Sequence, residues 1–169
     1  MTDPGRLTLE DQLCFALYAA TNAVTRAYRP RLQQIGLTYP QYLVLLALWQ
    51  DGPAPASRIA GRLRLAPNAM TPLLDRLEHV ALIRRDRDPD DRRVVVVSLT
   101  PTGAALEAAA ARAQRAVVCD TQLGSAALAA LRDELIALVR RMEPDRVGNT
   151  APGGDVQAPE ISTERRALR

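Results

Sequence analysis

The 169-residue sequence predicts a mainly α-helical chain that contains one small β-hairpin. Hydrophobic residues make up 47% of the chain but aromatic residues only 4%, and this balance favours helices over a sheet sandwich. Apolar residues recur at helical spacing in several long segments, whereas residues 82–99 combine β-branched and charged residues around an Asp-Pro-Asp-Asp turn. The length is sufficient for one compact domain with a hydrophobic core.

Two helices are predicted in the first third of the chain. Thr8 and Asp11 have the spacing of a capping box, and the apolar repeat after them predicts a helix from about 9 to 30 or beyond. The repeating positions are Leu13, Leu17, Ala20, Val24 and Ala27. The segment TYPQYLVLLALW predicts a second helix that begins near Pro40. Because this segment is almost wholly apolar, we expect it to be the central, buried helix, ended by the Gly-Pro pair that follows.

Two short helices joined by a tight turn are predicted between residues 57 and 80. Ser57 is a candidate N-cap for the first of them, and Pro67 suits the first position of the second. In the second helix an apolar face is expected in the core; it consists of Met70, Leu73, Leu74 and Leu77. The residues expected to face outward are Asn68, Ala69, Thr71, Pro72, Asp75, Arg76 and His79.

A β-hairpin with a charged tip is predicted next, with strands at about 82–86 and 93–99. Residues 82–93 contain five arginines and four aspartates, so charge alone is equally compatible with a self-neutralised, solvated hairpin. A helix-turn-helix followed by a hairpin is, however, the element order of a winged helix. In that fold the second helix enters a DNA major groove and the wing reaches the adjoining minor groove or backbone.

Two further helices are predicted after the hairpin. Thr100 and Pro101 indicate the start of a helix that runs to about 122, and another follows Gly124 and ends at Met142. One face of the last helix carries Leu128, Leu131, Leu135 and Leu138. Residues 144–169 are polar and rich in proline and glycine, and we expect them to be disordered.

Composition restricts the chemistry that the chain can perform. The N-terminal segment has no signal-peptide pattern and the longest apolar run, YLVLLALW, is too short to span a membrane, so a cytoplasmic location is expected. With two cysteines, no CxxC motif and one histidine, neither a zinc site nor a disulfide framework is expected, and no cofactor is required. If the thiols of Cys14 and Cys119 have a function, it is redox chemistry.

The segment DPDDRRVVVVSLTPTG resembles the wing and the following helix start of the MarR family of winged-helix regulators. The matching positions are Asp91, Arg93, Val95, Val97, Leu99, Thr100 and Gly103. The resemblance implies that Arg93 enters a minor groove and that Asp91 orients it through a charge-assisted hydrogen bond. The DNA-binding residues would then be Asn68, Ala69, Thr71, Pro72, Arg76, Arg85, Arg87, Asp91 and Arg93.

The same resemblance implies a domain over residues 8–143 that forms a homodimer. The dimerisation helices would lie at about 8–35 and 101–142, and the two recognition helices would meet successive major grooves of near-palindromic double-stranded DNA. The apolar faces of the first and last helices need burial, which independently favours a dimer.

The N-terminal half is similar to one branch of that family, the organic hydroperoxide resistance regulators. The motifs LCFxLY, Tyr-Lys/Arg-Pro and LTYPQYLxLLxLW of that branch correspond to LCFALY, YRP and LTYPQYLVLLALW here. The resemblance implies that Cys14 is the peroxide-sensing thiol and that Tyr28 and Tyr39 hydrogen-bond to it. Tyr18, one turn after Cys14, is a further candidate hydroxyl, and Cys119 lies where two-cysteine members carry a resolving cysteine.

Helix geometry bears on this implied site. Cys14 and Tyr28 lie 14 positions apart, which is about 21 Å along a continuous helix, so they cannot touch within one subunit. If two such helices cross antiparallel, Cys14 of one chain can approach Tyr28 of the other. The helix dipole has mostly faded at Cys14, so hydroxyl groups must stabilise its thiolate. A cysteine on an apolar face is otherwise most often a small core residue.

These observations predict a repressor that binds DNA while Cys14 is reduced. Organic hydroperoxide would oxidise Cys14, Cys119 of the partner subunit would form a disulfide with it, and DNA would be released. One alternative is a MarR-type repressor released by a phenolic or drug-like ligand, whose response would survive loss of both cysteines. A thiol peroxidase is disfavoured because the chain lacks a CxxC motif and a second histidine, so no enzymatic activity is expected.

Overall fold

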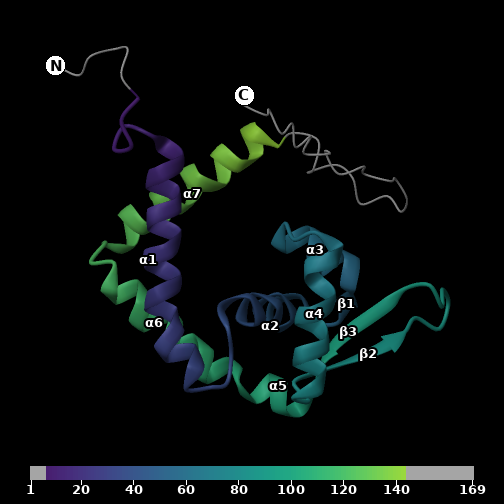
Figure 1. Cartoon of the computed structure of the whole chain (residues 1–169). Helices are drawn as coiled ribbons and strands as arrows, with labels where there is room; N and C mark the ends of the chain where they lie inside the picture. The colour runs from purple at the N-terminus through teal and green to yellow at the C-terminus, as the bar shows by residue number, and fades with distance from the viewer. Residues whose placement is uncertain (1–6, 144–169) are drawn as a thin grey trace, which may run out of the picture. The chain divides into compact units, whose positions relative to one another are not determined.

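The computed structural model describes residues 7–143. The chain divides into one compact unit that ends at Ala129 and a second that begins at Ala130. The first unit contains α1 (Leu13–Gln33), α2 (Tyr39–Asp51), β1 (Ala54–Pro55), α3 (Ala56–Leu63), α4 (Pro67–His79), β2 (Ile83–Arg87), β3 (Val95–Leu99), α5 (Pro101–Ala105) and α6 (Glu107–Asp120) (Figure 1). α7 (Ser125–Met142) begins in the first unit and continues into the second. The predicted fold class, helical with a small hairpin, is confirmed.

α1 begins later than the sequence predicts. The Thr8 hydroxyl donates to the Asp11 carboxylate at 2.5 Å, but this contact lies in a turn, and the helix begins at Leu13 with Gln12 as its N-cap. The predicted capping box is therefore wrong, because the two side chains bond to each other instead of to the backbone N–H groups that a helix start exposes. The helix then continues through Pro30 to Gln33.

α2 is the central helix, as predicted, and its start is fixed by a cap that the sequence reading overlooked. The Thr38 backbone N–H donates to Gln41 Oε1 at 2.8 Å, which forms one half of a capping box. The helix supplies much of the core through Tyr42, Val44, Leu45, Ala47 and Leu48. Gly52 ends it with a φ of 74°, a left-handed backbone angle that glycine adopts without a steric penalty.

α3 and α4 form the predicted helix-turn-helix. Ser57 is not the N-cap of α3, because β1 keeps the chain extended through Pro55, which takes the N-cap position instead. Arg64 adopts the left-handed region at the turn (φ 53°), and α4 begins at Pro67 as predicted. The predicted inner face of α4 is confirmed for Met70, Leu74 and Leu77, which are buried, and Leu73 packs against the core while partly exposed.

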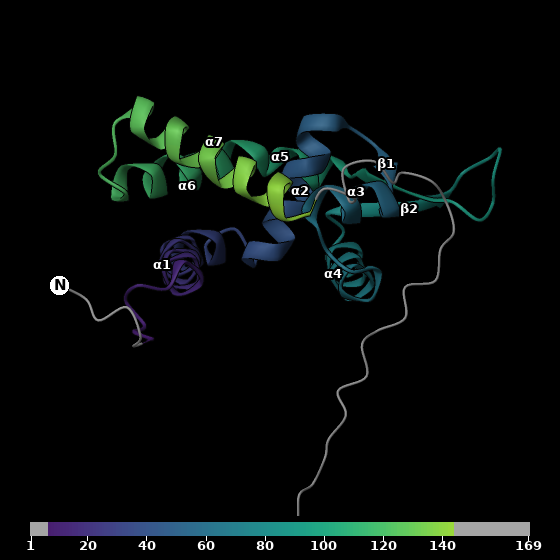
Figure 2. The ribbon, with the colours of Figure 1, turned by 90° about the horizontal axis from the view of Figure 1, so that it is seen from above.

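The sheet has three antiparallel strands in the order β1-β3-β2. β1 was not predicted, because a two-residue strand that contains a proline carries no alternating pattern. β2 and β3 pair from Ile83↔Leu99 to Arg87↔Val95, so the connecting loop is longer than expected. Ile83 and Val97 are buried and attach the hairpin to the core, and its tip extends away from the helices (Figure 2).

The single helix predicted over 101–122 is instead two helices with a break at Leu106. The Gly103 carbonyl accepts hydrogen bonds from the Trp49 indole N–H at 3.1 Å and from the Leu106 N–H at 3.3 Å. Because Leu106 bonds three residues back instead of four, the helix tightens there and restarts as α6. Gly103 also lies against the Leu82 carbonyl, where an added Cβ would come within 2.0 Å of the oxygen.

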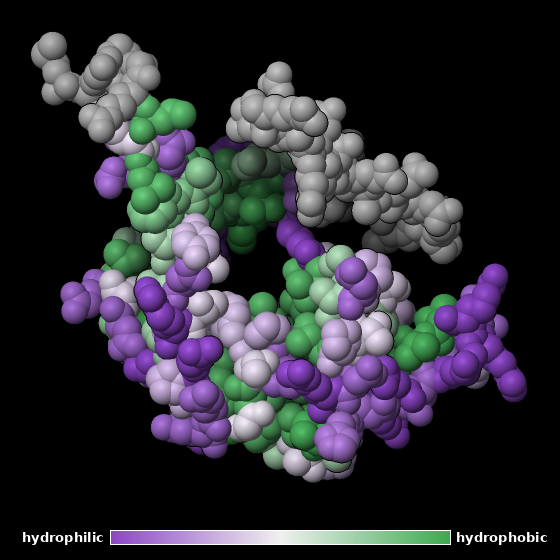
Figure 3. Space-filling view, in the orientation of Figure 1, coloured by the Kyte–Doolittle hydropathy of each residue, from purple (hydrophilic) through white to green (hydrophobic). Residues whose placement is uncertain are grey.

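The helices expected to form a dimer interface expose apolar side chains. α6 lies beside α1 (Figures 1 and 2), and the Arg31 guanidinium pairs with the Asp120 carboxylate at 2.8 Å. On α1, Leu13 is 60% exposed, and hydrophobic side chains continue along the N-terminal half of this helix (Figure 3). On α7 Leu131 is 50% exposed, and none of its residues is buried.

No helix among residues 7–143 is long and apolar enough to cross a membrane. The segment 144–169, predicted to be disordered, lies outside the described residues.

Candidate DNA interface and thiol site

The outer face of α4 presents the side chains that sequence reasoning assigned to DNA. Asn68, Ala69, Thr71, Pro72 and Arg76 are all exposed. Met70, Leu74 and Leu77 anchor the opposite face, so this helix can dock in a groove without disturbing the core. Entry of these side chains into a major groove stays a prediction.

The tip of the hairpin is shaped by its aspartates. Asp88 Oδ1 accepts the backbone N–H groups of Asp90 at 2.9 Å and Asp91 at 3.2 Å, which folds the loop. Arg93 donates from Nε to Asp91 Oδ1 at 3.1 Å and from Nη2 to Oδ2 at 3.3 Å. This fork holds the pKa of the Asp91 carboxyl below its ordinary value and leaves the Arg93 side chain 91% exposed. The Asp91–Arg93 contact that the resemblance implied is therefore present.

The other two wing arginines assigned to DNA differ from each other. Arg87 is exposed and donates to the Arg92 carbonyl at 3.1 Å, within the hairpin. Arg85 instead pairs with two carboxylates of α4, Asp75 at 2.8 Å and Glu78 at 2.5 Å. The sequence could not distinguish the two, because both lie in the same run of charged residues.

Four aromatic rings from α1 and α2 form a cluster in the core. The Tyr28 and Tyr39 ring centroids lie 5.1 Å apart, and Tyr42 lies 5.5 Å from Tyr28 and 6.5 Å from Trp49. Tyr28 and Tyr39 are therefore neighbours, as a shared thiol site requires. Tyr42 was missed, although its spacing of three residues from Tyr39 places it on the same helical face.

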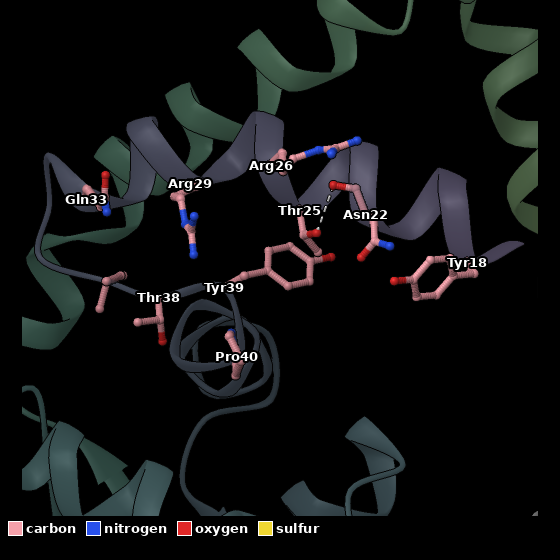
Figure 4. Close-up of a pocket in the computed structure, with 10 residues that line it drawn as sticks. Tyr18, Asn22, Thr25, Arg26, Arg29, Gln33, Thr38, Tyr39 and Pro40 are labelled. Atoms are coloured by element: carbon pink, nitrogen blue, oxygen red, sulfur yellow. Dashed lines mark hydrogen bonds between the residues drawn. The ribbon is translucent and has the colours of Figure 1, made fainter.

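Next to this cluster lies a pocket of about 610 Å³ between α1 and the start of α2. Figure 4 shows the Tyr18 and Tyr39 side chains pointing into it, with Arg26 and Arg29 along the same stretch of α1. Tyr18 is otherwise 66% exposed. The structure thus brings the predicted hydroxyls of Tyr18 and Tyr39 to one pocket, which Cys14 of the same chain does not line.

The two thiols are free and exposed, and the contacts of α1 with the end of α6 indicate that they lie far apart within one chain. Cys119 neighbours Asp120, which pairs with Arg31, and Arg31 is 17 positions after Cys14 on the continuous helix α1. That separation corresponds to about 25 Å along the axis, more than an arginine side chain and a disulfide can span together. No group of three or more metal-ligating side chains occurs among residues 7–143.

Burial of the tyrosine cluster predicts how the free energy of unfolding changes at alkaline pH. Burial, followed by the neighbouring Tyr42, raises the pKa of Tyr28 from 10.0 to about 12. Below pH 10 both the folded and the unfolded chain keep this proton, but between pH 10 and 12 the unfolded chain loses it first. We therefore expect the free energy of unfolding to fall by about 1.4 kcal/mol per pH unit in this window. Urea unfolding at several pH values measures this slope, and Tyr28→Phe should flatten it; equal slopes would contradict the assignment.

An exposed recognition helix beside a hairpin with an exposed, oriented arginine defines a winged-helix DNA-binding protein. The model of the MarR family matches residues 37–95. The organic hydroperoxide resistance transcriptional regulator of Bacillus subtilis (strain 168) is 43% identical over 101 residues, which cover 60% of this chain and 69% of that protein. The chain belongs to the MarR family of transcriptional regulators, which bind DNA and are not enzymes.

Two other relatives extend the comparison. The HTH-type transcriptional regulator TtmR of Methylorubrum extorquens (strain PA1) is 49% identical over 110 residues, 63% of this chain and 56% of that protein. Reduced AbfR bound to DNA is 32% identical with a TM-score of 0.67, over 79% of this chain and 94% of AbfR. AbfR, a protein of Staphylococcus epidermidis, has also been solved in an overoxidised form bound to DNA and in a disulfide form.

Proposed function

We propose that this regulator is a dimeric repressor that binds its operator while Cys14 is reduced and leaves it when an organic hydroperoxide oxidises Cys14. The observation that carries the proposal is the separation, along α1, of an exposed cysteine from a clustered tyrosine pair. Within one chain, neither the cysteine nor the tyrosine pair forms a complete thiol site by itself. Two copies of α1 crossing antiparallel would complete two such sites.

The exposed apolar face of α1 supports this dimer. Leu13 and Val24 remain 60% and 38% exposed in the single chain, and their burial against a second copy would be favourable. The same contact would bring Cys14 of one chain toward the pocket beside Tyr39 of the other. An apolar wall around the thiol would favour organic hydroperoxides over hydrogen peroxide.

The proposed chemistry has two steps. The Cys14 thiolate, stabilised by hydrogen bonds from tyrosine hydroxyls, attacks the distal oxygen of the hydroperoxide; the O–O bond breaks, an alcohol leaves, and Cys14 becomes a sulfenic acid. The Cys119 thiol then loses its proton and attacks the Cys14 sulfur; the S–O bond breaks, and the leaving hydroxide takes up that proton to form water as the disulfide forms. The hydroperoxide is the oxidant in the first step, and the Cys119 thiol is oxidised in the second.

Cys119 of the partner subunit is the resolving thiol in this proposal. Cys119 of the same chain lies next to Asp120, whose partner Arg31 is about 25 Å along α1 from Cys14, so the two thiols of one chain are too far apart to bond. Closing the gap between subunits requires movement of the interface helices, and these helices set the spacing of the two recognition helices. The disulfide would thereby couple oxidation to DNA release.

Two relatives support this proposal. The Bacillus subtilis relative is named for organic hydroperoxide resistance, and AbfR is known in reduced, overoxidised and disulfide forms. Because reduced AbfR was solved on DNA, we expect the reduced form of this protein to be a DNA-binding form as well.

The direct test is operator binding by the purified protein with and without cumene hydroperoxide. We expect at least about tenfold weaker binding after treatment, which is about 1.4 kcal/mol, and recovery with dithiothreitol. Unchanged affinity under conditions that oxidise the thiol would contradict the proposal.

A ligand-released repressor is the second candidate, and the pocket between α1 and α2 is the observation that favours it. Arg26 and Arg29 beside Tyr18 and Tyr39 could bind an acidic phenolic compound. A variant without either cysteine distinguishes the two mechanisms, because DNA release by such a ligand would persist in it.

A prediction for the DNA interface concerns Arg93 and Arg76. Replacing either with alanine should weaken operator binding by about 1 to 3 kcal/mol, since the first is presented at the wing tip and the second on the exposed face of α4. Affinity is measured at matched salt, because phosphate contacts make binding salt-dependent. Arg115→Ala removes an equal charge from α6 and serves as control. If both variants bind like the control, the DNA surface lies elsewhere.

A further inference from the structure

One arginine of the hairpin contacts the recognition helix instead of the solvent. We propose that Arg85, together with Glu78, is a positioning residue that holds the wing at a fixed angle to α4, so that Arg93 and the exposed face of α4 engage the same DNA duplex. The inference rests on the assignment of α4 and the wing as the DNA surface. It does not depend on redox sensing.

The contacts between Arg85 and α4 are extensive. The Arg85 backbone N–H donates to Glu78 Oε1 at 3.1 Å, and its Nε and Nη2 donate to Glu78 Oε2 at 2.8 and 2.5 Å. Nη2 also lies 2.8 Å from Asp75 Oδ1. These bonds hold the pKa of the Glu78 carboxyl below its ordinary value, so Glu78 is ionised wherever the protein binds DNA near neutral pH.

The position of Arg85 in the sheet is suitable for holding the hairpin in a fixed direction. It pairs with Val97 in the middle of the β2–β3 ladder, so a bond at this point fixes the direction of the hairpin (Figure 1). In contrast, Arg84, Arg87 and Arg93 make their hydrogen bonds to partners within the hairpin. The contacts of Arg85 therefore connect the middle of the hairpin to α4.

The same contacts argue against Arg85 as a phosphate ligand. Its side chain is only 27% exposed, compared with 91% for Arg93, and two carboxylates already compensate its charge. To bind a phosphate it would have to give up a bidentate partner. We therefore revise its role from DNA contact, which sequence reasoning assigned, to positioning.

Glu78→Gln tests this role, because electrostatics and positioning predict opposite signs. Removing a negative charge close to the DNA surface should strengthen binding if Glu78 acts only through its charge. If it holds the wing, we expect binding to weaken roughly tenfold. The salt dependence should stay unchanged because no phosphate contact is lost, whereas Arg87→Ala, the matched control at the exposed position, should lower the slope by about 0.9 if it meets a phosphate.

A double-mutant cycle with Arg93→Ala separates positioning from general destabilisation. If the contact between Arg85 and Glu78 places Arg93 in its groove, Arg93→Ala should reduce operator affinity much less in the Glu78→Gln background than in the wild type. Arg85→Lys gives a second variant, because it keeps the positive charge but loses the fork. We expect it to weaken binding too; a phosphate ligand would be largely retained by lysine. Additive effects in the cycle, tighter binding by Glu78→Gln, or wild-type affinity of Arg85→Lys would overturn the proposal.

Discussion

Replacing Cys14 with serine should abolish the response of operator binding to organic hydroperoxide while leaving the affinity of the untreated protein within about twofold of wild type. Serine preserves the size of the side chain at this exposed position on α1 but cannot form a sulfenic acid. The DNA-binding elements α4 and the wing are remote from the substitution in sequence. Fluorescence anisotropy with labelled operator, with and without cumene hydroperoxide, measures both quantities.

Two outcomes would contradict this expectation. Peroxide-induced release by Cys14→Ser would show that another group senses the oxidant. Loss of operator binding in the untreated variant would show that Cys14 is needed for the fold or the dimer. Cys119→Ser separates oxidation from release: it keeps the thiol that meets the oxidant first, so Cys14 should still form a sulfenic acid, but DNA release should fail because the disulfide cannot form.

Among glycine-to-alanine substitutions within residues 7–143, Gly103→Ala should lower the free energy of unfolding most. An added Cβ would lie 2.0 Å from the Leu82 carbonyl oxygen and 2.9 Å from its carbon, both backbone atoms. That carbonyl also accepts the Thr100 N–H at 3.1 Å, so it cannot move without breaking the junction between the wing and α5. We expect a loss of about 3 kcal/mol or more in urea unfolding.

Gly124→Ala is the matched control for that experiment. Its added Cβ would meet nothing within 4 Å, and alanine restricts the unfolded chain, so we expect stability to stay within about 1 kcal/mol of wild type. Equal stability of the two variants would show that the contact between Gly103 and Leu82 is looser than the geometry indicates.

Local signals explain which parts of the fold the sequence could predict. The apolar run of α2, the inner face of α4 and the two longer strands are encoded by periodicity within each segment. In contrast, the break at Leu106 lies beside the Gly103 carbonyl, which accepts a hydrogen bond from the Trp49 indole 54 positions away in the sequence. The short strand β1 likewise exists only through its pairing with β3. Contacts of this kind leave no pattern in a single segment.

In the candidate site, too, features formed by residues near in sequence were predictable and contacts between distant segments were not. The exposed face of α4 and the fork between Asp91 and Arg93 follow from spacing and a motif, because the interacting groups are near in sequence. The role of Arg85 required the structure, since its neighbours in the charged run bond elsewhere and only the fold brings it to Glu78. The proximity of Tyr28 to Tyr39 also depends on the packing of α1 against α2.

In the proposed mechanism, oxidation joins Cys14 of one subunit to Cys119 of the other. The most direct measurement uses Cys14→Ser and Cys119→Ser proteins, alone and mixed under conditions that allow subunit exchange, then treated with cumene hydroperoxide and run on non-reducing electrophoresis. Each variant alone should migrate as the 18.4 kDa chain. The mixture should yield a covalent dimer, because only a mixed dimer places Cys14 of one chain opposite Cys119 of the other. A mixture that stays monomeric, while the wild type loses DNA binding, would contradict the intersubunit disulfide and leave oxidised Cys14 itself as the signal.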